Sequence, residues 1–257
     1  MLKKRLIGVV TVKNGLAVQS FGYKTYLPLG RPEFLVENLD RWGADEIFVQ
    51  CIDRSSLGLG PDLALLERIS RLGLSTPLIY AGGIRNAEDG CAVIQAAADR
   101  VCIDAMLHDN LSHVHLLAEK LGSQAIISAL PLSFENNELL WLDYRNGSFK
   151  KLSSELLIAF KSGVLSEALI VDWKHEGHPG QFDSQLLAAF QLEGIPLIAF
   201  GGLSEVKDIR SVLELPSSVG VAIGNFLAYS EHAIQNYKLE LKGMPIRGAT
   251  YGNNLIS

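Results

Sequence analysis

The 257-residue sequence is poor in the features that most quickly assign a protein to a class. Its three cysteines, Cys51, Cys91 and Cys102, form no CxxC pair, so a disulfide framework is not expected and reduced thiols in a cytoplasmic protein are favoured. No apolar run reaches about 18 residues, so no membrane span is expected. The net charge of −5, without any cluster of lysine and arginine, argues against a nucleic acid partner.

The sequence does have 48% hydrophobic residues and a regular alternation of short apolar runs with longer helical patterns, such as 32–43 and 60–73. Strands that alternate with helices predict parallel βαβ units, and eight of them predict a closed (β/α)8 TIM barrel. No Ser/Pro/Gly linker interrupts the pattern, so we expect a single α/β domain over residues 1–257. The expected strands are residues 6–12, 46–52, 77–83, 100–105, 124–131, 167–173, 196–202 and 219–224.

Residues 135–152 break this rhythm. Asn146-Gly147 lies between two apolar runs in this stretch, and an Asn-Gly pair favours the tight turn of a β-hairpin. We therefore expect a small β-hairpin inserted after the fifth strand.

An internal repeat supports the barrel. TPLIYAGGI (76–84) matches IPLIAFGGL (195–203) at an offset of 119 residues, and ADEIFVQ (44–50) matches SEALIVD (166–172). Such a repeat predicts a four-strand half-barrel used twice. A two-domain Rossmann protein is the alternative, which is weakened because no GxGxxG follows the first strand.

Glycines end several of the expected strands, at Gly82-Gly83, Gly201-Gly202 and Gly224-Asn225. Ligands of such barrels bind where the strands end, and glycine lets the backbone approach an anion. A glycine pair can also serve only a tight turn, but matching pairs in both half-barrels favour phosphate binding at both ends of an elongated ligand. Asp104 lies at an equivalent strand end, where its charge would favour a hydroxyl or ammonium group.

Five segments carry a resemblance to a known family: KRLIGVVTVKNG (4–15), RPEFLVENLDRWGADEIFV (31–49), YAGGI (80–84), GSQAII (122–127) and IAFGGL (198–203). In order and spacing they resemble the HisF family, the cyclase subunit of imidazole glycerol phosphate synthase. The resemblance extends from residue 1 to about residue 240. It implies a barrel that receives ammonia from a HisH-like glutaminase subunit on its bottom face and, in the family, passes it to a ribonucleotide with two phosphates.

The resemblance breaks at the top of the barrel. The two catalytic aspartates of the family fall on Thr11 and Pro131, its strand-2 aspartate on Cys51 and the lysine of its strand-1 loop on Gln19. Its Asn-Thr pair after strand 4 falls on Asp104-Ala105. Neither threonine nor proline exchanges a proton near neutral pH, so the ordinary cyclase mechanism is not expected. The resemblance and the strand ends give these predicted ligand-binding residues: Gly82, Gly83, Asp104, Gly177, Gly201, Gly202, Gly224 and Asn225.

The bottom of the barrel retains the family pattern. Its four-residue ammonia gate falls on Arg5, Glu46, Arg100 and Glu167, with arginine in place of lysine at one position, and Asp99 matches a glutaminase contact. Charges at this end of a barrel can also serve stability alone. The match at all four positions favours a retained gate.

Replacement chemistry at the top would need other acid or base groups. The predicted catalytic residues are Asp104, His175 and His178. Cys51 with the two histidines could bind a metal, but their spacing is not specific, so neither a metal nor a cofactor is expected. The long loop after strand 1, with Tyr23 and Tyr26, is a mobile lid in the family.

These observations favour the synthase-side subunit of a glutamine amidotransferase or lyase-type complex. The resemblance is to the HisF-like branch linked to acetamidino modification of sugars in bacterial surface polysaccharide, including lipopolysaccharide O-antigen. It implies a HisH-like glutaminase, an ATP-dependent amidotransferase and a phosphorylated or nucleotide-sugar ligand as partners. The alternatives are a histidine-pathway cyclase with relocated catalysts and a non-catalytic scaffold that activates its glutaminase.

Overall fold

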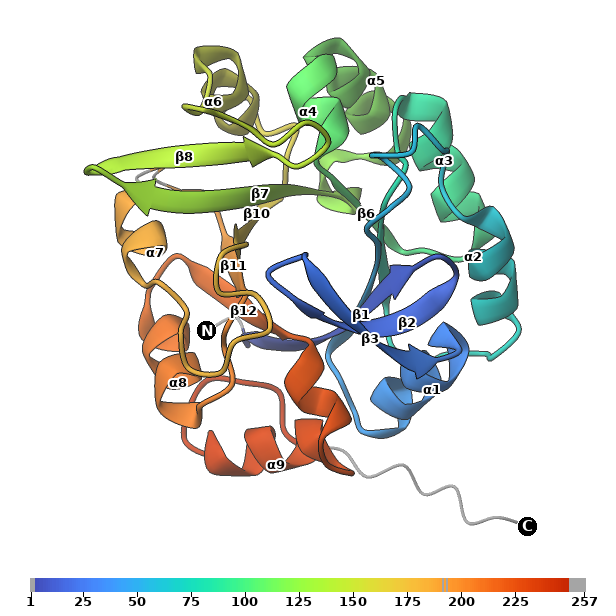
Figure 1. The fold of residues 1–257 in the computed structure, drawn as a ribbon, viewed down its shortest axis with the longest axis vertical. Coiled ribbons are helices and arrows are strands. Elements are labelled where there is room, and N and C mark those ends of the chain that lie inside the picture. The colour runs from blue at the N-terminus through green and yellow to red at the C-terminus, as the bar shows by residue number, and fades with distance from the viewer. Residues whose placement is uncertain (1–2, 191, 193, 250–257) are drawn as a thin grey trace.

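The computed structural model describes residues 3–190, 192 and 194–249, and its centre is a closed barrel of parallel strands (Figure 1). Neighbouring strands pair in the order β10-β11-β12-β1-β4-β5-β6-β7, and β7 pairs with β10 to close the ring. All eight expected strands and the TIM barrel are therefore confirmed. The barrel strands are β1 (Arg5–Lys13), β4 (Glu46–Cys51), β5 (Leu78–Ala81), β6 (Arg100–Ile103), β7 (Ile126–Glu135), β10 (Glu167–Asp172), β11 (Leu197–Phe200) and β12 (Ser218–Ile223).

Helices surround the barrel and connect its strands, as Figure 1 shows. They cover the outer face of the sheet with their apolar sides, which is why their sequences read as amphipathic. No helix in the described part of the chain is long and apolar enough to cross a membrane. The helices are α1 (Pro32–Arg41), α2 (Leu63–Ser70), α3 (Ala87–Ala96), α4 (Ala105–Asp109), α5 (Leu111–Leu121), α6 (Ser154–Lys161), α7 (Gln185–Ala189), α8 (Val206–Glu214) and α9 (Ala233–Glu240), with short 3-10 turns at Ser123–Ala125 and Asn225–Ala228.

Alternate side chains of each strand face the barrel axis and the helices, as the two-residue period of a strand requires. In β1, Ile7 and Val9 belong to the cluster inside the barrel, whereas Leu6 and Val10 belong to the core between strands and helices. The interior is thus packed with side chains, as in other barrels of this kind.

The half-barrel repeat is visible in the packing of the strand-end glycines. A Cβ on Gly82 would lie 2.3 Å from the carbonyl oxygen of Cys51, and one on Gly201 would lie 2.4 Å from that of Asp172. Both glycines also have positive φ. The two halves therefore make the same tight turn against the preceding strand.

Two hairpins at the top of the barrel depart from a plain TIM barrel. The expected loop after strand 1 is instead an antiparallel hairpin of β2 (Leu16–Phe21) and β3 (Thr25–Gly30). The predicted insertion is confirmed and larger than expected, because β7 continues beyond the barrel and pairs with β8 (Glu138–Asp143), which pairs with β9 (Ser148–Lys150).

A buried ion pair joins the last helix to the base of the barrel. Lys238 of α9 contacts the Asp45 carboxylate at 2.8 Å, with side chains only 2% and 3% exposed. The other carboxylate oxygen accepts a hydrogen bond from the Leu6 backbone N–H of β1 at 2.8 Å. This cluster fixes α9 to both β1 and the start of β4.

Lys238→Met is expected to lower the free energy of unfolding by about 3 kcal/mol or more, because it leaves the Asp45 carboxylate buried without its cation. Urea unfolding measures this loss, and adding Asp45→Asn should recover part of it. Arg71→Met, which removes an exposed pair with Glu67, is the control and should change stability by less than about 0.5 kcal/mol. Equal losses in the two single variants would contradict the role given to Lys238.

Candidate functional site

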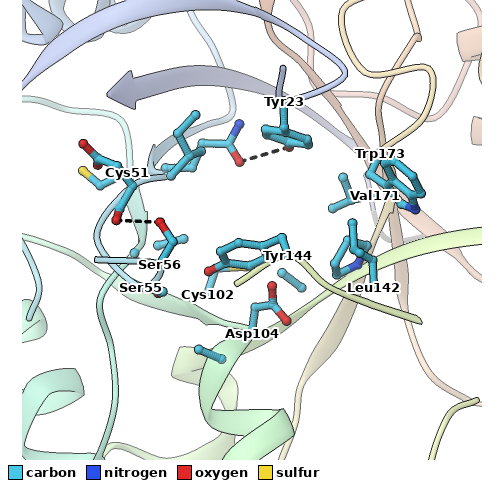
Figure 2. Close-up of a pocket in the computed structure, with 18 of the residues that line it drawn as sticks. Tyr23, Cys51, Ser55, Ser56, Cys102, Asp104, Leu142, Tyr144, Val171 and Trp173 are labelled. Atoms are coloured by element: carbon cyan, nitrogen blue, oxygen red, sulfur yellow. Dashed lines mark hydrogen bonds between the residues drawn. The ribbon is translucent and has the colours of Figure 1, made fainter. Parts of the chain in front are cut away.

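A cavity of about 500 Å³ opens at the C-terminal ends of β4, β5, β6, β7 and β10. Barrel enzymes place their ligands at this end of the strands. Figure 2 shows its walls, which come from both hairpins as well as from the strand ends. The lining includes Tyr23, Tyr26, Phe48, Gln50, Cys51, Asp53, Ser55, Gly82, Gly83, Cys102, Asp104, Pro131, Leu142, Tyr144, Phe149, Val171 and Trp173.

Aromatic rings form much of the wall. Tyr23 and Tyr26 come from the β2–β3 hairpin, Tyr144 and Phe149 from the insertion, and Trp173 from the end of β10. Phe149 and Trp173 pack with ring centroids 5.8 Å apart. The two hairpin regions and the end of β10 therefore supply the flat apolar surfaces of the cavity, and the other barrel strands supply its floor.

Asp104 is the predicted catalytic residue that the structure does place in this cavity. In Figure 2 its carboxylate points from the end of β6 toward the Tyr144 ring. Its side chain is only 13% exposed, and its Oδ1 lies 3.2 Å from Nε2 of His108, without the alignment of a hydrogen bond. Burial raises the pKa of Asp104, and the contact with His108 opposes this. Asp104 is therefore suited to hold or release a proton closer to neutral pH than an ordinary aspartate.

His108 packs against the β7–β9 insertion on the side away from Asp104. The sequence interpretation did not single out this histidine. Its ring stacks on Trp141 with centroids 3.7 Å apart, and its Nδ1 lies 4.0 Å from the Asp143 carboxylate. Arg145 in turn donates hydrogen bonds to Asp143 and to Asp109. The hydrogen bond from Arg145 lowers the pKa of Asp143 to about 2. The i, i+4 spacing of Asp104 and His108 was the available signal for this pair, but it says nothing of the distant residues behind it.

Neutral groups occupy the positions of the family's catalytic aspartates. Thr11 is buried and accepts a hydrogen bond from Nε2 of Gln50 at 2.8 Å, and Oε1 of Gln50 lies 3.5 Å from the Tyr23 hydroxyl. Pro131 lines the cavity on β7. Neither Thr11 nor Pro131 can exchange a proton near neutral pH.

The two thiols of the cavity are also poor acid–base groups. Burial raises the pKa of Cys51 to about 12, and burial raises that of Cys102 still further. Since the thiolate is the reactive form, both side chains act as small apolar residues here.

The other predicted phosphate end, at β11 and β12, is packed with the protein's own chain. A Cβ on Gly177 would lie 2.0 Å from the carbonyl oxygen of Ser20, and one on Gly202 would lie 2.9 Å from that of His175. The Asn225 amide exchanges two hydrogen bonds with the Ser20 backbone, at 3.1 and 2.6 Å. Packing alone thus requires glycine at these turns, as it does at Gly82 and Gly83, and phosphate binding at either end stays a prediction.

His175 and His178 lie on the loop after β10, outside the lining of the cavity. His175 Nδ1 contacts the carboxylate of Asp172 at 2.8 Å, and the His178 ring packs near Phe21. Asp172 faces away from the barrel axis, as its place in the strand predicts. The structure therefore does not bring the three predicted catalytic residues together. Within residues 3–190, 192 and 194–249, no three His, Cys, Asp or Glu side chains lie close enough to bind a metal ion. Cys51, His175 and His178 therefore do not form the metal site that the sequence left open.

Glu176, between the two histidines, is the residue that closes this end. Its carboxylate is 2% exposed and accepts hydrogen bonds from the Ser20 hydroxyl at 2.8 Å and the Tyr23 N–H at 3.3 Å. Its carbonyl oxygen accepts a bond from the Gly22 N–H at 2.8 Å. Burial raises the pKa of Glu176 to about 7 in spite of these hydrogen bonds. The β2–β3 hairpin is thereby fastened to the loop after β10.

At the opposite mouth, four charged side chains form a closed ring. Arg5 contacts Glu46 at 3.0 Å and Glu167 at 2.9 Å, and Arg100 contacts the same two carboxylates at 3.4 and 3.0 Å. All four side chains are between 9% and 14% exposed. Asp99 beside the ring is exposed, and one of its oxygens accepts a hydrogen bond from the Leu78 N–H. Each of the four side chains is therefore paired with two of opposite charge, although Nη2 of Arg5 and Oε2 of Glu46 lack an aligned hydrogen bond.

Comparison with known proteins agrees with this arrangement. The sequence profile described as "Histidine biosynthesis protein" matches residues 5–233. The chain belongs to this family. A Streptococcus mutans protein named imidazole glycerol phosphate synthase subunit HisF is 27% identical over 253 residues, which is 96% of this chain and 100% of that protein. A Vibrio vulnificus protein, named provisionally as subunit hisF2 of the same synthase, is 27% identical over 94% of this chain and 89% of its own length. The protein is thus a divergent HisF-like barrel.

The free energy of unfolding of this HisF-like barrel is expected to decrease as the pH rises from about 4.5 to about 7, because of Glu176. The pKa of its carboxyl is higher in the folded state, about 7, than in the unfolded chain, so the folded state binds more protons over this interval. Glu176→Gln removes this titration and keeps a hydrogen-bond acceptor. Between about pH 4.5 and about pH 8, the variant should therefore gain up to about 3 kcal/mol relative to the original chain in urea unfolding.

Glu135→Gln is the matched control, because the hydrogen bond from Lys174 lowers the pKa of Glu135 and its pH effect has the opposite sign. Parallel stability curves for Glu176→Gln and the original chain would show that Glu176 does not titrate in this range.

Proposed function

We propose that this HisF-like barrel is the synthase-side subunit of a glutamine-dependent amidotransferase complex. A HisH-like glutaminase would dock on the bottom face near Asp99 and release ammonia at the ring. The observation that carries the proposal is the alignment of a self-compensated charged ring at one mouth of the barrel with a ligand-sized cavity at the other. Ammonia is small and neutral, so a shift of one ring side chain would suffice to admit it.

The proposed acceptor is a sugar of bacterial surface polysaccharide that receives an acetamidino group, with an ATP-dependent amidotransferase as a further partner. The neutral residues Thr11 and Pro131 support this proposal, since delivery of ammonia needs no proton exchange at those positions. The aromatic walls also support it, because flat apolar rings are suited to the faces of sugar rings. A nucleotide sugar or another phosphorylated sugar is the proposed ligand.

A second candidate function is the cyclase step of histidine biosynthesis. The names of the relatives favour it, and Asp104 offers one acidic group with a raised pKa in the cavity. It would still need a second proton-transfer group close to the first.

Assay with added ammonium and the histidine-pathway nucleotide separates these two functions. The chain should turn over at least ~100-fold more slowly than an ordinary cyclase, because positioned acid and base groups typically contribute ~10²–10⁴-fold. Thr11→Asp combined with Pro131→Asp should raise this turnover, whereas Thr11→Asn with Pro131→Asn should not. Turnover at an ordinary cyclase rate by the original chain would contradict the proposal.

Substitution in the ring tests ammonia passage. Arg5→Ala leaves both carboxylates paired with Arg100, so the barrel should fold and still bind its glutaminase. In the reconstituted complex it should change product formation from glutamine several-fold and leave product formation from added ammonium unchanged. Lys3→Ala, an exposed cation on the same face, is the control. Identical glutamine-driven rates in every ring variant would favour a scaffold over a conduit.

A further inference from the structure

The charges around the cavity are unevenly distributed. Asp104 supplies a mostly buried carboxylate at the end of β6. The lining lysines belong to the hairpin side, where Lys24 is exposed and the Lys13 ammonium lies 3.8 Å from the centroid of the Tyr26 ring. Asp53, the second lining carboxylate, accepts a hydrogen bond from the Asn14 N–H at 2.7 Å. The inner end of the cavity is therefore negative, and the rim is mixed.

The Asp104 carboxylate is incompletely satisfied. Its Oδ1 is buried and lacks an aligned hydrogen bond, although His108 lies 3.2 Å away. The remaining exposed part of this carboxylate faces the cavity, and a ligand N–H that bonds to it would offset the cost of its partial burial. A phosphate or carboxylate placed there would instead face like-charge repulsion at short range.

The walls around this carboxylate are suited to a flat or cationic group. Tyr144 lies over Asp104, and Trp173 and Tyr23 border the same space (Figure 2). Aromatic faces attract cations as well as rings, and both effects strengthen when water is excluded. A volume of about 500 Å³ is in the range of sites for small organic ligands.

We propose that the inner end of this cavity binds a cationic N–H group, an ammonium or amidinium, of a ring-shaped ligand. Asp104 accepts hydrogen bonds from that group, and Tyr23, Tyr144 and Trp173 pack against the ring. His108 is a positioning residue, since it touches Asp104 from a buried place behind it. This binding mode deepens the proposed function, and it rests on that function for taking the cavity as the ligand site. Any phosphate of the ligand would lie at the rim, near Lys13 and Lys24.

Three near-isosteric probes test the charge preference: benzamidine (a cation), benzamide (neutral) and benzoate (an anion). Calorimetric or ligand-observed NMR titration of the full chain, without glutaminase or ammonia, should rank benzamidine above benzamide and benzamide above benzoate. Asp104→Asn should weaken benzamidine by ~10-fold or more, as expected for loss of a charged hydrogen bond, and should reduce the discrimination against benzoate.

Asp53→Asn is the matched control, because it removes the same charge from the same cavity and should leave benzamidine affinity within about twofold if Asp104 is the specific partner. The ranking on the original chain needs no variant, so a folding defect in Asp104→Asn cannot hide the answer. Absence of benzamidine binding, equal affinity for benzoate, or equal losses in the two variants would overturn the proposal. This test uses no ring variant such as Arg5→Ala. Its failure would therefore show a wrong ligand class, whereas failure of ammonia transfer would show only in the ring experiment.

Discussion

The two-residue period of a closed parallel barrel is the constraint on which the rest of the structure depends. Along β6 it turns Arg100, Cys102 and Asp104 toward the axis, so one strand supplies the charged ring, the apolar middle and the cavity floor. A slip of one residue would turn all three outward. Barrel closure therefore fixes which sequence positions face the axis at each mouth, but it does not fix which residue types occupy them. This freedom lets the base keep its ring while the top carries Thr11 in place of an acid.

The position of the cavity is set by the two hairpins more than by the barrel. The β2–β3 hairpin bonds to Asn225 after β12 and to Glu176 after β10, so it packs against this half of the barrel mouth. The β7–β9 insertion contacts α4 and adds aromatic side chains to the cavity. The internal repeat offers two equivalent strand-end sites; one hairpin packs against the first, and both contribute walls to the second. A symmetric scaffold thus acquires a one-sided site.

The features that follow from local patterns were predictable from the sequence. Strand and helix periods gave the barrel, and strand parity placed the ring residues together and Asp172 outside. The segment after strand 1 was expected to be a loop, but it forms the β2–β3 hairpin. That hairpin depends on pairing with β1 and on a hydrogen bond to Glu176, a residue more than 150 positions away. His108 was missed for a similar reason. Its significance comes from Trp141 and Asp143, which only the folded insertion brings behind it. Glycine pairs were ambiguous, since backbone crowding and anion binding select the same residue.

The two ends of the barrel also differ in how they satisfy buried charge. At the base each arginine contacts two carboxylates and each carboxylate two arginines, so every charge has two permanent counter-charges within the ring. At the top, Asp104 contacts His108, a base that is charged only when protonated, and lies beside the cavity. A buried carboxylate held this way is unfavourable for stability alone, because removing it from water costs more than one imperfect contact returns. Incomplete satisfaction of this kind is what a binding site requires, since the ligand then supplies the missing hydrogen bonds. The electrostatic contrast, and not the presence of charge as such, distinguishes the entrance of this barrel from its ligand site.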